Sequence, residues 1–137
     1  EKVIGMICLE MIGYYSYEPN SQMYPDDSFK EIYPTTGNFI IVVGLDSQVQ
    51  FSNKVFELIK QKAKIDVQKI NLPKENPLTQ LSDQKNYFHF GYNAVMINDT
   101  SFLRNPHYHQ ISDTIETLDF TKMAEVVNGC YNAVINL

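Results

Sequence analysis

The sequence has 137 residues, of which 44% are hydrophobic and 20% charged, and its formal net charge at pH 7 is −5. These values are typical of one soluble globular domain over residues 1–137. No apolar run reaches the roughly 20 residues that a transmembrane helix needs. No basic surface for phosphate contacts is evident either, so we expect no membrane segment in this chain and no nucleic-acid binding.

The first half of the chain predicts strands separated by one helix and one long loop. Three short, mainly apolar runs are typical of strands, the first two buried in a parallel or mixed sheet: residues 3–9, 38–45 and 67–72. Residues 16–36 are rich in Tyr, Pro, Asn, Asp and Ser and form a long irregular excursion. A helix is expected over residues 52–64, with Ser52 as its cap and lysines on its wet face.

The second half predicts two further helices and one buried strand. A short helix over residues 82–91 is expected to turn Tyr87, Phe88 and Phe90 inward, and residues 94–97 to form a strand. A second polar excursion covers residues 100–114. The last helix is capped by Asp119 or Thr121, and its apolar face is expected to comprise Met123, Val126, Val127, Cys130, Val134 and Leu137.

Strands interleaved with helices predict a layered α/β domain. In open α/β sheets, ligands bind beyond the carboxyl ends of the strands. Glu10 and Asp99 each follow a predicted strand directly, and both polar excursions begin near such an end. We therefore expect the chemistry at this edge of the sheet.

The residues alone leave the type of chemistry open. Glu10 fits a metal ligand, an acid or base, or a carboxylate that simply faces water. His107 and His109, with Asp113 nearby, offer the imidazole and carboxylate groups that zinc accepts, but two histidines in a loop are also typical of an ordinary surface. The sequence contains no H-E-x-x-H, C-x-x-C or G-x-S-x-G motif. Cys8 and Cys130 are expected to be buried, inert thiols.

Three stretches together resemble the zinc-dependent aminopeptidase family, which is related to the glutaminyl cyclases. Residues 8–14, CLEMIGY, resemble the strand end N-L-E/D-M-I-G. Residues 82–84, SDQ, followed by Phe88, Gly91 and Ala94, resemble S-D-H-x-x-F…G-x-P-A. Residues 104–109, RNPHYH, followed by DT at 113–114 and LD at 118–119, resemble R-N-x-x-Y-H-x-x-x-D-T…L-D. Their order and separation agree along almost the whole chain.

The resemblance implies a three-layer α/β/α fold with a mixed, mostly parallel sheet, incomplete in this chain, and one or two zinc ions at the strand ends. His109 matches a zinc ligand, and Glu10 matches a ligand in two-zinc members. Tyr108 matches a residue that stabilises the oxyanion, a role that a phenol O–H can perform. Asp83 matches a carboxylate beside the metal that orients catalytic groups.

The resemblance gives supporting roles to four more residues of the late loop. Asp113 and Thr114 are expected to brace this loop and so fix the ligand geometry. Arg104 and Asn105 are candidates for substrate contact, although holding the loop is an equally good interpretation.

The chain also departs from the family pattern. Gln84 stands where the family usually has histidine, and Asn93 where it usually has proline. The family's first histidine, bridging aspartate and paired glutamates all precede the strand at residues 3–9. Two ligands fall short of the three that a catalytic zinc ordinarily needs. We therefore expect a fragment that lacks the N-terminal half of its domain, with an independent protein that has lost its metal site as the alternative.

The expected activity of the parent protein is metal-dependent hydrolysis of N-terminal peptide bonds, with a peptide as substrate. The chain alone is expected to be inactive and to bind zinc weakly. Two alternatives remain: a cyclase-like acyl transfer, and a non-catalytic interaction domain that has kept the fold. We expect a soluble protein, with a secreted or periplasmic parent as an open alternative.

Overall fold

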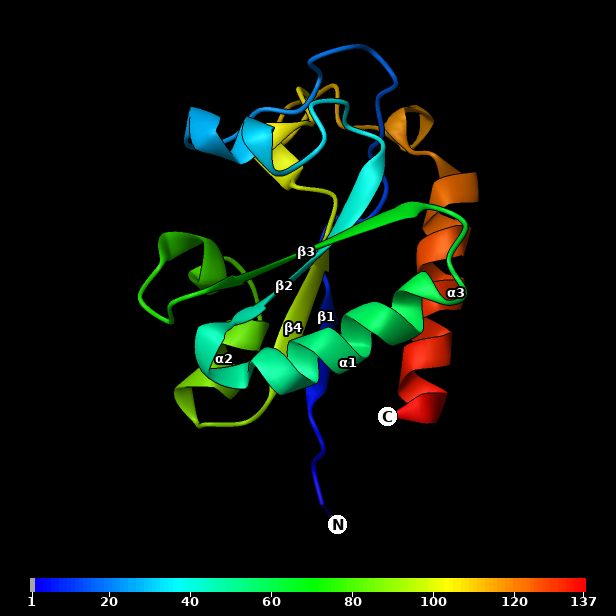
Figure 1. The fold of residues 1–137 in the computed structure, drawn as a ribbon. Helices are drawn as coiled ribbons and strands as arrows, with labels where there is room; N and C mark the ends of the chain where they lie inside the picture. Colours follow the sequence, from blue (N-terminus) through cyan, green and yellow to red (C-terminus); the bar gives the residue numbers. More distant parts are fainter. Residues whose placement is uncertain (1) are drawn as a thin grey trace.

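The fold is built on one four-stranded sheet, seen in a computed structural model that describes residues 2–137 (Figure 1). Glu1 lies outside the described residues. The sheet order is β1-β4-β2-β3, and the strands are β1 (Met6–Leu9), β2 (Phe39–Leu45), β3 (Asp66–Leu72) and β4 (Ala94–Asn98). β1 pairs with β4 and β2 with β3 in parallel, whereas β2 and β4 are antiparallel. The predicted α/β fold with a mixed, mostly parallel sheet is confirmed.

The position of each strand in the sheet decides how deeply it is buried. All residues of the central strands β2 and β4 are buried, as their continuous apolar runs predict. β1 is shorter than predicted, and Leu9 is 47% exposed. The prediction that β1 is buried on both faces is therefore wrong, because β1 lies at the end of the sheet order, with β4 as its neighbour.

Helices α1 (Val49–Lys60) and α3 (Phe120–Asn136) cover one face of the sheet. Their apolar sides meet Ile40, Val42, Val95 and Ile97 in the main hydrophobic core. The two helices approach closely at Gly129, where an added Cβ would lie 2.8 Å from Cγ2 of Ile59. A glycine inside a helix normally lowers its stability, so this one is explained by the close approach.

The predicted start of α1 is wrong by three residues. Ser52 is not its cap but a buried residue inside the helix, where its hydroxyl contacts the carbonyl of Val49 and Oδ1 of Asn71. Burial against β3 fixes this serine, and the sequence pattern alone does not reveal that contact.

The cap of α3 is confirmed at Asp119, whose carboxylate accepts a hydrogen bond from the Lys122 amide at 2.9 Å. The predicted apolar face is correct at Val126 and Cys130 but wrong at Val127 and Val134, which are 50% and 63% exposed. The buried stripe follows helical spacing through Gly129 and Ala133 instead, because small residues permit the approach to α1.

The opposite face of the sheet is covered by α2 (Gln84–His89) and by irregular segments. Only Phe88 of the three aromatic residues expected to point inward is buried, whereas Tyr87 and Phe90 are exposed. α2 is a single short element beside β1 and β4, so only one of its aromatic residues can reach the sheet.

Both polar excursions lie at the same end of the sheet (Figure 1). A backbone hydrogen bond from Met23 to the carbonyl of Leu103, 2.9 Å long, joins them. The two cysteines are free and buried, as predicted. Among the helices of residues 2–137, none has the length and apolar character required to cross a lipid bilayer.

Candidate functional site at the sheet edge

The carboxyl ends of β1 and β4 lie side by side, because these two strands are parallel neighbours. The Glu10 amide donates to the carbonyl of Ile97 at 3.0 Å, and the Asp99 amide donates to the carbonyl of Met11 at 2.7 Å. Glu10 and Asp99 therefore begin the two loops of this edge, as the position of their strand ends predicts.

The Glu10 carboxylate is held in a fixed orientation. The Ser82 hydroxyl donates to its Oε2 at 2.6 Å, and the Cys8 thiol lies 3.6 Å from the same hydroxyl. The Asn98 side-chain amide donates to the Glu10 backbone carbonyl at 2.5 Å. Ser82 was part of the motif quoted above, but its contact with Glu10 was not predicted.

Asp99 is buried, and its carboxylate is hydrogen-bonded to the backbone of the surrounding loops. Its carboxylate accepts hydrogen bonds from the backbone amides of Gly13, Tyr14 and Ser101, at 3.1, 2.8 and 2.9 Å. Burial raises the pKa of Asp99, while these amides and the Arg104 guanidinium act in the opposite direction. This carboxylate fixes the chain that follows Glu10 against the start of the late loop.

Arg104 is buried, and its contacts are inside the chain. Its Nε donates to Oε1 of Gln22 at 2.9 Å and its Nη1 to the carbonyl of Phe39 at 2.8 Å, while its Nη2 has no hydrogen-bond partner among residues 2–137. Burial lowers the pKa of Arg104 to about 10. Asn105 is buried as well, and its side chain accepts from the His107 amide at 2.8 Å. These contacts favour the loop-holding interpretation of both residues.

Tyr108 and His109 lie on the outer part of the late loop. Their rings stack with centroids 3.8 Å apart, and His109 is exposed with a backbone φ of 56°. Histidine is among the non-glycine residues that adopt a left-handed backbone most readily, so this φ fits a residue within the turns of the late loop. Nδ1 of His107 lies 2.9 Å from the Ser112 hydroxyl.

The other predicted site residues lie at the surface. Asp83 directly follows Ser82, precedes α2 and is exposed. Asp113 and Thr114 are exposed too, and the Thr114 carbonyl accepts from the Thr117 hydroxyl at 2.7 Å. The roles of Asp83, Asp113 and Thr114 remain predictions.

The donor set does not by itself form a complete zinc site. Over residues 2–137, no group of three or more His, Cys, Asp and Glu side chains could hold a metal ion. Glu10 and His109 have the right ligand chemistry, but a catalytic zinc site normally has three protein ligands. The chain alone therefore does not fit a catalytic metal centre.

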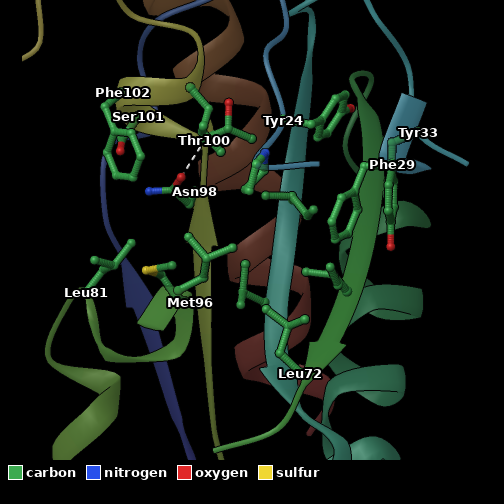
Figure 2. A pocket seen from close by; sticks show the side chains of 16 residues that line it. Tyr24, Phe29, Tyr33, Leu72, Leu81, Met96, Asn98, Thr100, Ser101 and Phe102 are labelled. Atoms are coloured by element: carbon green, nitrogen blue, oxygen red, sulfur yellow. Dashed lines mark hydrogen bonds between the residues drawn. The ribbon is translucent and has the colours of Figure 1, made fainter. Parts of the chain in front are cut away.

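An apolar pocket on one face of the sheet was not predicted. It has a cavity volume of about 80 Å³ and is partly open to solvent. Its floor is the sheet face opposite α1 and α3, with Ile41, Val43 and Met96 among the lining residues. Figure 2 shows Tyr24, Phe29 and Tyr33 on one side of it, and Leu81 and Met96 on the other. The sequence did contain one indication of this pocket, because β2 has apolar residues on both of its faces.

The chain is similar in sequence to an Escherichia coli protein and in fold to a Legionella aminopeptidase. The chain is 39% identical over 131 residues to the Escherichia coli K12 protein YfbL, which is described as uncharacterised, and it spans 41% of that protein's length. Two structures of Legionella pneumophila LapA, an aminopeptidase, match 97% and 98% of the chain with TM-scores of 0.66 and 0.61. Their sequence identities are 20% and 19%, and the chain covers 31% and 32% of them. No protein-family model matches the chain.

Proposed function

We propose that this chain is part of a metal-dependent aminopeptidase that hydrolyses N-terminal peptide bonds. The observation that carries this proposal is the position of Glu10 at the carboxyl end of β1, beside the start of the loop that follows β4, in a sheet whose fold is similar to that of an aminopeptidase. The chain spans less than half of YfbL and about a third of LapA, so the proposal concerns a longer polypeptide.

Within this proposal, Glu10 and His109 supply two metal ligands, and residues outside the chain supply the others. Ser82 orients the Glu10 carboxylate through the 2.6 Å hydrogen bond, and a fixed ligand geometry supports metal affinity. A bound zinc ion would act as a Lewis acid toward the peptide carbonyl.

Three further groups of residues support the site. The Tyr108 phenol donates to the developing oxyanion. Asp83 stands beside the site and orients catalytic groups, and Asp113 and Thr114 brace the loop that carries His109. Arg104 and Asn105 hold the base of that loop through the buried contacts described above, and this leaves substrate contact a secondary role for them.

The test uses the full-length protein that contains this chain, depleted of metal and then titrated with zinc. We expect Glu10→Ala and His109→Ala to lower the bound zinc and to reduce hydrolysis of L-leucine anilide by several orders of magnitude. His89→Ala is the matched control, because His89 is an exposed histidine on α2. Asp113→Asn should reduce zinc affinity by roughly 10- to 100-fold, less than the loss of a ligand.

Wild-type zinc content and activity in both ligand variants would contradict the proposal. Cyclisation of an N-terminal glutamine peptide without hydrolysis would instead support the cyclase-like reaction. Absence of both reactions, with no zinc uptake, would support a non-catalytic interaction domain.

A further inference from the structure

The two edges of the sheet differ in how they are protected. β3 forms one edge and carries the polar residues Asp66, Gln68 and Lys69, and the Lys69 carbonyl accepts a hydrogen bond from Tyr33 at 3.0 Å. β1 forms the other edge, and its sequence, MICL, has no charged residue and no proline. Exposed edge strands are usually protected by lysine, proline, a bulge or a covering segment. The sequence of β1 is therefore typical of a strand that pairs on both sides.

The backbone of β1 has free hydrogen-bonding groups on its outer side. The Met6 and Glu10 amides donate to carbonyls of the β4 segment, both at 3.0 Å. Because successive residues of a strand direct their backbone groups to alternate sides, the amides of Ile7 and Leu9 point away from β4. Within residues 2–137, β1 has no neighbouring strand on that side. A further strand can pair with these groups.

Apolar surface continues from this edge onto the helix-covered face of the sheet. Leu9 pairs in register with Ile97 and therefore lies on the same face. Ile97 is completely buried, whereas Leu9 is 47% exposed. α1 lies over β2 and β3, and the start of α3 lies beside the segment that follows β1, where the Asp119 amide donates to the Gly13 carbonyl at 2.8 Å. The cover provided by the two helices therefore stops short of the outer side of β1.

Helix α3 has an apolar flank that faces away from α1. Gly129 and Asn132 mark the flank that contacts α1, and the Asn132 side-chain amide donates to the Leu58 carbonyl at 2.7 Å. The opposite flank, here called the α3 outer flank, is apolar at helical spacing and 50% to 66% exposed: Phe120, Val127, Tyr131 and Val134. A helix that is apolar on this side as well as toward the sheet is typical of one that packs against a further helix.

We propose that the β1 edge and the α3 outer flank form the docking surface for a strand and a helix of the same polypeptide, from the part outside these 137 residues. The strand satisfies the outer backbone groups of β1, and the helix buries the α3 outer flank. YfbL matches 96% of this chain, yet the match covers 41% of YfbL, so more than half of that relative lies outside the matched region. Segments of one polypeptide also meet at a high effective concentration. This inference does not depend on the proposed aminopeptidase function.

Hydrogen–deuterium exchange of the full-length protein, resolved to single amides, tests the strand. The Cys8 and Glu10 amides pair with β4 and should exchange slowly, which shows that the sheet is folded. The Ile7 and Leu9 amides should exchange within roughly a factor of ten of that rate, because the added strand protects them. Exchange of Ile7 and Leu9 at the rate of an unpaired amide would overturn the proposed pairing.

Thiol labelling of the same protein tests the helix. Val127→Cys places a thiol on the α3 outer flank, and the control Asn128→Cys places one at the next position, which is exposed and lies outside that flank. Cys8 and Cys130 are buried, and the wild type gives the background rate. Relative to the unfolded variants, Val127→Cys should react at least about tenfold more slowly than Asn128→Cys. Equal rates would overturn the proposed helix contact.

A photo-crosslink identifies what covers the α3 outer flank. The photoreactive p-benzoylphenylalanine, incorporated in place of Phe120, should cross-link to a segment of the same polypeptide outside the 137 residues, as mapped by mass spectrometry. A cross-link to a second copy, or protection of Val127→Cys that is lost on dilution, would overturn the proposal in favour of a dimer. None of these measurements uses a substrate, so a negative result here leaves the proposed aminopeptidase function standing, and an inactive protein leaves this docking surface standing.

Discussion

The two faces of the sheet differ in how they are covered. On one face, α1 and α3 bury Ile40, Val42, Val95 and Ile97 completely. On the other face, α2 and the loops leave an apolar pocket, and Ile70 and Leu72 of β3 stay half-buried. Apolar area removed from water stabilises the fold, whereas apolar area that remains accessible is available to a ligand. One face thus supplies stability, and the other has room for recognition.

The largest effect is expected on the helix-covered face. Ile59→Ala should lower the free energy of unfolding by about 2–5 kcal/mol, because Ile59 is completely buried between α1, α3 and the sheet and the variant leaves a cavity. Urea denaturation followed by circular dichroism measures the change. Ile59→Val is the matched control, with an expected loss of about 0.5–1.5 kcal/mol. Equal stability of Ile59→Ala and the wild type would contradict the assignment of this face.

The next largest loss of stability is expected at the edge of the sheet that carries the candidate site. Asp99→Asn should cost about 2–3 kcal/mol, because one amide oxygen cannot accept from the three backbone amides that Asp99 binds. The buried Arg104 also loses a nearby negative charge. Thermal unfolding monitored by calorimetry gives the change. Asp46→Asn, at an exposed position outside the candidate site, should leave the melting temperature nearly unchanged.

A smaller effect is expected at the start of α3. Asp119→Ala should lower stability by about 1 kcal/mol, because the side chain no longer caps the helix at the Lys122 amide. Asp119→Asn keeps a capping oxygen and should recover most of this loss. Chemical denaturation at pH 7 compares the three proteins, and an alanine variant as stable as the wild type would show that this cap is dispensable.

The smallest effect on stability is expected in the pocket wall. Leu81 is 51% exposed, so Leu81→Ala should change the free energy of unfolding by about 0.5 kcal/mol or less. Ile111→Ala is a suitable control, because Ile111 is fully exposed at 102% and lies outside the pocket. A large loss of stability in Leu81→Ala would mean that the pocket face of the sheet contributes to the stability of the fold as the helix-covered face does.

Local patterns predicted most elements of the fold. The continuous apolar runs of β2 and β4 identified them as buried strands, and the position of Asp119 identified the start of α3. The errors occur where packing decides: Ser52 is buried against Asn71, and Val127 and Val134 face outward although they are apolar. Helical periodicity gives several overlapping apolar stripes in α3, and only the close approach at Gly129 selects one of them.

The candidate site could be predicted in part. Its edge followed from Glu10 and Asp99 at the ends of two predicted strands, because parallel strands bring their carboxyl ends together. The contact of Ser82 with Glu10 joins residues 72 positions apart, and no local pattern encodes such a distance. The same holds for the burial of Arg104 against Phe39 and Gln22.

The sequence by itself determined the α/β class, the main strands and helices, and the edge of the sheet where polar residues gather, because alternation, apolar runs and capping residues act over a few neighbours. Only the tertiary structure decided which face of the sheet α1 and α3 cover and where the apolar pocket opens. Those features depend on contacts between β2, β3, β4 and the distant aromatic wall at Tyr24, Phe29 and Tyr33. The free energy of such packing depends on contacts between side chains from several distant segments, so it cannot be predicted from any one segment alone.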